Sequence, residues 1–280
     1  FYYEHEVDEP GKKLVEELIE GGIAEDERPE GPVIVRIDEK LGLDKDKYRV
    51  AVVLRSDGTA LYATWDPALA IKKFEDYDLD KSIYVVDVRQ SLHFQQVFKI
   101  LELYGRKDLT NKSYHLPYEI VNLPGNVTMK SREGTVVLLD TLIKEAKQRA
   151  LETVEEKNPN LEDAQKQEIA EQVALGAIKF PMLARDNTKI ATFDWESALN
   201  FNGKSSPYIQ YAHVRAASIL RQAEEAINPE IKPDYELHKA EIELIDTISQ
   251  LPATVLKAAE DHKTLLITNL AYDLAKSFND

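Results

Sequence analysis

Two cations and a hydroxyl occupy three consecutive positions near the middle of the 280-residue sequence. Lys130, Ser131 and Arg132 follow a Pro-Gly turn and precede Gly134, and an amphipathic helix is predicted from about Val136. This combination suits contact with a polyphosphate, which needs charge-assisted hydrogen bonds and close approach of the backbone. A solvated basic turn is the alternative interpretation, and it is the commoner origin of an isolated Lys-Ser-Arg.

A phenol and a carboxylate lie four residues apart where a strand is predicted to give way to a helix. Tyr62 precedes Asp66, and Pro67 is expected in the first turn of a helix that runs to about Phe74. An aspartate at a helix start is usually an N-cap. The functional alternative is a carboxylate at a strand end, where open α/β sheets bind ligands. There it could accept the planar donor fork of a guanidinium, with the Tyr62 hydroxyl beside it.

A third polar group directly follows SIYVVDV, which is predicted to be a buried parallel strand. Gln90, His93 and Gln96 recur at helical spacing, so they can line one side of the first turns of a helix. The structural interpretation is that Ser91 caps this helix while the other polar groups face solvent. Both interpretations can hold together.

Aromatic and basic residues open a predicted helix after Pro207. A tyrosine stripe at helical spacing is more often core or interface packing than an RNA platform. Aromatic rings and arginine are nonetheless the groups that hold unstacked RNA bases. The residues of this group are Tyr208, Gln210, Tyr211, His213 and Arg215.

The composition is that of a globular protein, with 43% hydrophobic and 30% charged residues and room for one large domain or two ordinary ones. The sequence shows no apolar run of membrane-spanning length and no signal or transit peptide. It lacks cysteine, which fits a reducing cytoplasm, and its six histidines are scattered, so no protein-bound metal is expected. The net charge of −15 argues against non-specific binding to DNA or RNA but permits a local RNA-binding face.

The first half of the chain alternates strands and helices and predicts half of a doubly wound α/β domain, with only part of its sheet. Asp57-Gly58 is expected to join two β-rich runs as a hairpin. The predicted elements are a helix at 10–23, strands at 31–37 and in 48–64, a helix at 67–74, a strand at 82–88, a helix at 91–104 and a strand at 115–123.

The second half is predicted to be almost entirely helical, as a bundle packed beside the α/β part. A short extended segment is expected at 190–194. The predicted helices are 138–157, 161–180, 208–227, 234–250, 254–263 and 264–278.

Several of these blocks, in this order, resemble arginyl-tRNA synthetases over residues 48–280. Tyr62-x-x-x-Asp66 is followed by YVVDVRQSLHFQQVF, LPGNVTMKSREGTVVLLD, EEKNP, VALGAIKF, FDWESALNFNGKSSPYIQYAHVRAASIL and AYDLAKSFND. The basic loop resembles the KMSKS loop of class I synthetases in its arginyl form, typically MSSRKG followed by TVV or NVV. The resemblance implies a partial Rossmann-like fold and an all-α anticodon-binding bundle. It implies three segments: 1–60 as connective insertion and approach to the catalytic domain, 61–150 as the second half of that domain, and 151–280 as the bundle.

The resemblance also implies a role for each group in a cytoplasmic ligase that joins arginine to tRNA(Arg). Tyr62, Asp66 and Gln90 would hold arginine, and His93 and Gln96 would lie near ATP or the adenylate. The catalytic Lys130, Ser131 and Arg132 would stabilise charge on the phosphates of ATP, which Mg²⁺ accompanies. The five residues of the aromatic and basic group would open the bundle that meets tRNA.

Two departures from the family pattern affect these expectations. The loop reads MKSREG, so Glu133 stands where a lysine is usual, and Lys130 can restore the missing cation. The chain contains no HIGH-type motif, begins at Phe1 without methionine and stops at SFND, which indicates an excised piece that does not aminoacylate by itself. The alternatives are a synthetase-like module that only binds tRNA or a protein partner, and an unrelated helical interaction protein.

Overall fold

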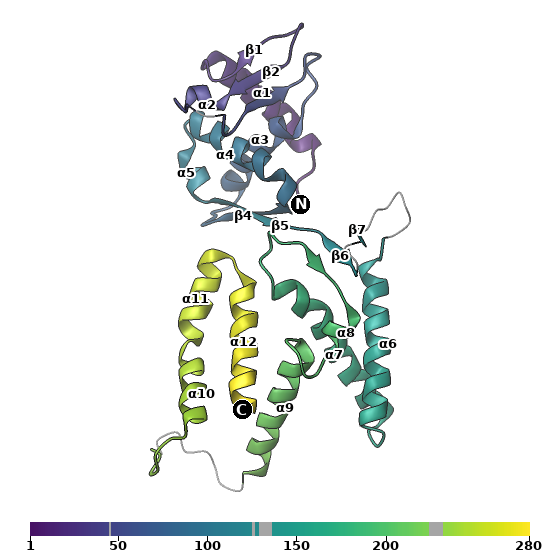
Figure 1. Ribbon diagram of the computed structural model, residues 1–280. Helices are drawn as coiled ribbons and strands as arrows, with labels where there is room; N and C mark the ends of the chain where they lie inside the picture. Colours follow the sequence, from purple (N-terminus) through teal and green to yellow (C-terminus); the bar gives the residue numbers. More distant parts are fainter. Residues whose placement is uncertain (45, 125–126, 129–135, 224–231) are drawn as a thin grey trace. The chain divides into compact units, whose positions relative to one another are not determined.

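The computed structural model describes residues 1–44, 46–124, 127–128, 136–223 and 232–280 (Figure 1). The chain divides into two compact units, Phe1–Tyr118 and Glu119–Asp280. None of the helices within the described ranges combines the length and the apolar character needed to cross a membrane.

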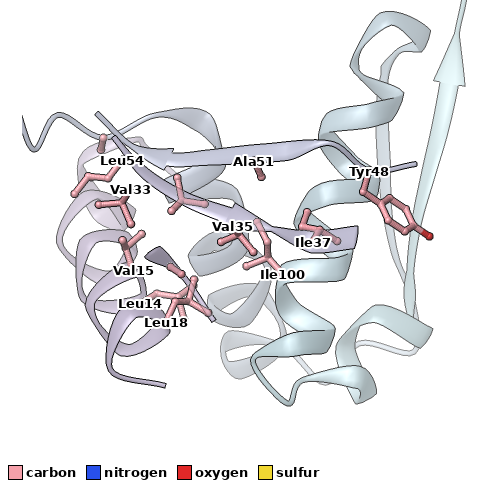
Figure 2. Close-up of a cluster of buried hydrophobic side chains, with 13 residues drawn as sticks. Leu14, Val15, Leu18, Val33, Val35, Ile37, Tyr48, Ala51, Leu54 and Ile100 are labelled. Atoms are coloured by element: carbon pink, nitrogen blue, oxygen red, sulfur yellow. The ribbon is translucent and has the colours of Figure 1, made fainter. Parts of the chain in front are cut away.

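The first unit is built on an antiparallel sheet packed against helices. Its core consists of branched aliphatic side chains, and Val33, Val35 and Val53 are completely buried. In Figure 2, Leu14 and Leu18 of the first helix lie against these strands. The elements of this region are α1 (His5–Glu20), β1 (Glu25–Asp26), β2 (Val33–Arg36), α2 (Ile37–Lys40), β3 (Val50–Leu54) and α3 (Tyr62–Asp76), with the sheet order β1-β2-β3.

The predicted hairpin at Asp57-Gly58 forms its turn but not its second strand, so this part of the prediction is wrong. The turn forms, with Gly58 at φ +80°, but the returning chain makes a single bridge from Leu54 to Ala60 and then enters α3. The buried Thr64 explains this outcome, because its hydroxyl donates to the Val53 carbonyl and accepts the Leu61 N–H at 2.8 Å. The tertiary bond to the strand favours a helix where the local pattern favours β structure.

A two-stranded parallel sheet completes the first unit, as the sequence predicts. Strands β4 (Ser82–Asp87) and β5 (Ser113–Tyr118) pair in register, and α4 (Ser91–Leu103) packs on one face through Phe94, whose ring lies 5.1 Å from that of Tyr84. The expected burial of β4 on both faces is wrong, because Ile83 and Val85 are 45% and 62% exposed. The connecting elements are η1 (Val88–Gln90) and α5 (Lys107–Asn111).

The second unit is mainly helical, and its helices confirm the predicted bundle with shifts of several residues at the ends. The predicted strand at 115–123 is divided, since only its last part belongs to this unit. The elements are β6 (Val121–Leu123), β7 (Val127–Thr128), α6 (Leu139–Lys157), α7 (Asp163–Leu183), β8 (Ala191–Thr192), α8 (Trp195–Ala198), α9 (Ser206–Gln222), α10 (Lys239–Ser249), α11 (Leu251–Asp261) and α12 (Thr264–Asn279).

Candidate functional site

A carboxylate and an imidazole meet where α3 packs on α4. The Nε2 of His93 lies 2.5 Å from Oδ2 of Asp66, although the two residues are 27 positions apart. Their side chains are 22% and 23% exposed, so the contact is partly shielded and still reachable from solvent. Asp66 is therefore not an N-cap, because α3 begins at Tyr62 and places it in the second turn.

Two more of the predicted arginine-site residues lie within one helical turn of this contact. Tyr62 precedes Asp66 by four residues on α3, which puts both on the same face of the helix. Its side chain is 72% exposed. Gln90 is the N-cap of α4, three residues before His93, and it is exposed. The structure thus brings the carboxylate and the imidazole together, with the phenol and the amide each one helical turn away along its own helix.

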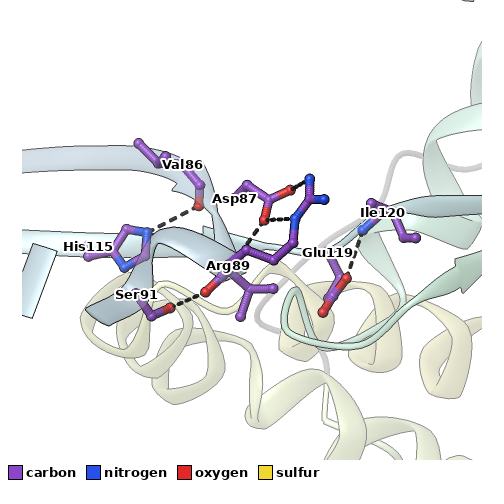
Figure 3. A network of polar contacts seen from close by, with 8 residues as sticks. Val86, Asp87, Arg89, Ser91, His115, Glu119 and Ile120 are labelled. Atoms are coloured by element: carbon purple, nitrogen blue, oxygen red, sulfur yellow. Dashed lines mark hydrogen bonds and ion pairs between the residues drawn. The ribbon is translucent and has the colours of Figure 1, made fainter. Parts of the chain in front are cut away.

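The start of α4 differs from the sequence prediction in its capping. The Ser91 hydroxyl does not cap the helix; it donates to the Val88 carbonyl at 2.6 Å because the turn η1 precedes α4. Figure 3 shows the guanidinium of Arg89 folded onto the carboxylate of Asp87, at 2.9 Å from Nε and 2.8 Å from Nη2. These bonds, followed by one from the Arg89 backbone N–H, lower the pKa of Asp87 to about 2.

Gln96 is held by the fold rather than left free. Its amide Nε2 donates to the Tyr48 carbonyl at 2.7 Å, which ties α4 to the chain before β3. His93, three residues earlier on α4, contacts Asp66 on α3 instead, so the two side chains have different partners.

Sequence reasoning missed a polar cluster beside Tyr62. Trp65 donates from Nε1 to Oδ1 of Asp8 at 2.9 Å, and Lys12 donates to Oδ2 at 2.7 Å. The bond from Lys12, and then that from Trp65, holds the pKa of Asp8 below its ordinary value. An open pocket of about 630 Å³ adjoins this cluster, with Arg55 on its rim. The partners are 57 residues apart, so a local pattern carries no signal of the bond.

The aromatic and basic group on α9 divides into half-buried and exposed members. The ring of Tyr208 lies 5.5 Å from that of Tyr272 on α12, and Gln210 donates to the Gln172 carbonyl on α7 at 3.1 Å. Tyr211 is 53% exposed, and His213 and Arg215 are exposed as well. Packing therefore accounts for Tyr208 and Gln210, whereas Tyr211, His213 and Arg215 lie on the surface.

Residues 7–195 match the family described as tRNA synthetases class I (R), catalytic domain. The chain belongs to this arginyl-tRNA synthetase family. Residues 209–280 match the DALR anticodon binding domain, which includes most of α9 and all of α10, α11 and α12. The predicted family and fold class are therefore confirmed.

The chain is also similar to named relatives and to solved structures. It is 39% identical to the arginine–tRNA ligase of Clostridium kluyveri over 238 residues, 84% of this chain and 41% of the relative. Identity to the Clostridium perfringens ligase is 38% over 271 residues, 95% of this chain and 45% of the relative. The Thermus thermophilus arginyl-tRNA synthetase structure matches with a TM-score of 0.81 at 32% identity, covering 97% of this chain and 50% of that one. The chain thus spans about half the length of these proteins or less.

In this family member, the predicted phosphate loop cannot be placed. Lys130, Ser131, Arg132 and Glu133 lie outside the described residues. Described elements precede and follow the loop: β6 pairs with β7 and β8, and α6 begins at Leu139. Across the part of the chain that is described, no group of three or more His, Cys, Asp or Glu side chains is arranged to hold a metal ion.

Proposed function

We propose that the chain is part of an arginine–tRNA ligase, which activates arginine with ATP and transfers it to tRNA(Arg). In the first step an oxygen of the arginine carboxylate attacks the α-phosphorus of MgATP, and pyrophosphate leaves. In the second step the 3′-terminal ribose hydroxyl of tRNA attacks the carbonyl of arginyl-adenylate, and AMP leaves. Membership of the family supports this proposal, as do relatives named arginine–tRNA ligase at 38–39% identity.

The arginine side chain would be held where α3 meets α4. The observation that carries this assignment is the Asp66–His93 contact, with Tyr62 and Gln90 each within a helical turn of it. A partly shielded carboxylate is a strong acceptor for a guanidinium. A lysine ammonium lacks the planar fork and citrulline lacks the charge, so the site would reject both.

The ATP side of the reaction would use the following helix and the loop. His93 and Gln96 would lie near the adenylate, and Lys130, Ser131 and Arg132 would stabilise the charge that develops on the phosphates. Neither step needs a protein nucleophile, so the contribution of these residues is positioning and electrostatic stabilisation. Mg²⁺ enters as part of the MgATP substrate.

The helical unit would supply the tRNA contact. Tyr211, His213 and Arg215 are exposed on α9 for stacking and phosphate contact, while Tyr208 and Gln210 fix this helix on α12 and α7. In functional terms we assign residues 1–60 to the connective insertion and the approach to the catalytic domain, 61–150 to the second half of the catalytic domain and 151–280 to the anticodon-binding bundle. The place of action is the cytoplasm, in keeping with a sequence without cysteine.

The substitution Asp66→Asn, made in the full gene-encoded protein, tests whether Asp66 binds the arginine side chain. The substitution keeps the size of the side chain and removes its charge, so arginine-dependent ATP–pyrophosphate exchange should fall roughly 100-fold, the loss expected for a charged hydrogen bond. Glu75→Gln is the matched control, because Glu75 is an exposed carboxylate on the same helix, and it should leave exchange unchanged. Exchange at the wild-type rate in Asp66→Asn would contradict the proposed role of Asp66 in binding arginine.

A further inference from the structure

The carboxylate of Asp66 is engaged unequally at its two oxygens. Oδ2 lies 2.5 Å from Nε2 of His93, whereas Oδ1 makes no hydrogen bond to any residue in the described ranges. A carboxylate normally meets a guanidinium through both oxygens in a fork-to-fork pair. With Oδ2 already in contact with an imidazole, Oδ1 is the oxygen that a guanidinium can approach directly.

The imidazole of His93 packs against an aromatic cluster of the first unit. The ring of His93 lies edge-on to Phe94 at 5.3 Å, and Phe94 is only 5% exposed. Phe94 in turn stacks on His115 of β5 at 4.8 Å. His93 therefore links a buried aromatic cluster to the carboxylate at the surface, which restricts the rotation of both side chains.

We propose that His93 is a positioning residue for arginine: its imidazole donates Nε2–H to Oδ2 of Asp66 and fixes Oδ1 in the orientation that meets the guanidinium. This inference rests on the proposed arginine site and gives His93 a role toward arginine in addition to its proposed place near the adenylate.

The other charged groups around α4 are engaged elsewhere. On the neighbouring elements, Asp87 at the end of β4 pairs with Arg89 of η1, and His115 of β5 contacts the Val86 carbonyl. Asp38 of α2 accepts backbone N–H groups, and Lys107 of α5 pairs with Glu102 of α4. Within the described chain, Asp66 is the charged group that contacts His93.

Two substitutions at His93 test its hydrogen bond to Asp66. His93→Leu removes the bond, and the KM for arginine should rise about tenfold with kcat within about twofold and the KM for ATP unchanged. His93→Gln keeps an N–H donor, so the KM for arginine should stay within about twofold of wild type. His115→Gln is the matched control, since this histidine contacts the same Phe94 ring but not Asp66.

The measurements are steady-state ATP–pyrophosphate exchange at varied arginine and at varied ATP on the gene-encoded protein, with Asp66→Asn in parallel. An inactive Asp66→Asn together with an unchanged arginine KM in His93→Leu, or with a raised KM for ATP alone, overturns the positioning role and leaves the proposed function standing. A fully active Asp66→Asn overturns the proposed function instead. If His93→Leu does not fold, His93→Ala decides, and an arginine KM at the wild-type value in that variant contradicts the inference.

Discussion

The two compact units fill their interiors with opposite kinds of side chain. In the first unit the buried residues are branched and large, such as Val35, Ile37 and Leu18 (Figure 2). In the second unit the contact between α6 and α7 consists mainly of alanines, with Ala146 and Ala174 completely buried. The distance between packed helices depends on the side chains at their contact, so alanines allow these two to approach closely.

The two units also differ in what their helices present. The first unit joins polar side chains that are distant in sequence at the candidate site, as in Asp66–His93 and Asp8–Trp65. The second unit has long-range polar bonds as well, such as Lys204–Asn269, but its helices α10 and α11 also expose a series of large aliphatic side chains, among them Ile245, which is 53% exposed. Fixed polar groups suit chemistry, whereas an exposed helical surface suits contact with a large partner.

Truncating a core residue of the first unit should have the largest effect on stability. Leu18 is 1% exposed, and Leu18→Ala should lower the free energy of unfolding of this unit by about 2–5 kcal/mol, through lost burial and a residual cavity. The sequence has two tryptophans, Trp65 in the first unit and Trp195 in the second, so each unit has its own fluorescent reporter.

Single-tryptophan backgrounds make that measurement specific. Denaturation of Leu18→Ala in a Trp195→Phe background follows the first unit, and the same substitution in a Trp65→Phe background follows the second. Only the first transition should move to lower denaturant. Equal shifts of both transitions would show that the two units unfold as one and would remove the basis of the comparison.

Enlarging a residue should be the damaging change in the second unit. Ala174→Leu adds volume within the buried alanine cluster of α6 and α7, so overpacking should destabilise this unit by about 1–3 kcal/mol. Ala164→Leu on the same helix is exposed and should stay within about 0.5 kcal/mol of wild type. A tolerated Ala174→Leu, measured through Trp195, would mean that the alanine contact is loosely packed.

Two helical glycines give a smaller and more local comparison. A Cβ on Gly11 of α1 would lie 2.7 Å from the backbone carbonyl oxygen of Thr64, whereas one on Gly176 of α7 would meet the Ser206 side chain, with the Ser206 Cβ at 3.0 Å. Backbone cannot move aside cheaply, so Gly11→Ala should cost about 1–3 kcal/mol. Gly176→Ala should cost under about 1 kcal/mol, because alanine favours the helix and a side chain can adjust.

The serine partner supplies the control for the second glycine. Adding Ser206→Ala to Gly176→Ala removes the hydroxyl that the new methyl group meets, so the double variant should recover part of the lost stability. Thermal unfolding of the single and double variants measures this coupling. If the stability losses of Gly176→Ala and Ser206→Ala simply add, the strain does not arise from contact between these two side chains.

The sequence predicted the elements whose signals are local. The stop of α4 before Gly105, the parallel β4–β5 pair and the long helices α6 and α7 follow from periodicity and from helix-ending residues. The start of α3 was misplaced, because it depends on the hydroxyl of Thr64 reaching the Val53 carbonyl of a neighbouring strand. Propensity and turn signals do not contain such a bond.

The candidate site shows the same limit. The residue types and the spacing of Gln90, His93 and Gln96 were visible in the sequence, but the pairing of His93 with Asp66 was not. The Asp8–Trp65 bond was missed for the same reason, since its partners are brought together by the packing of α1 on α3. Sequence patterns identified the groups that could do chemistry, and tertiary packing decides which of them meet.

The smallest expected effect compares one carboxylate in each unit. The pKa of Asp87 is lowered to about 2, first by the Arg89 side chain, whereas the pKa of Asp194 is lowered first by the backbone N–H of Ser197, which it caps. A lowered pKa stabilises the fold above the ordinary value of about 3.9, and this contribution is lost as the pH falls toward 2. Arg89→Gln should therefore raise the pKa of Asp87 and leave that of Asp194 unchanged, as measured by carboxyl carbon NMR between pH 1.5 and 6. Movement of both values would contradict the difference between the side-chain bond that lowers the pKa of Asp87 and the backbone cap that lowers that of Asp194.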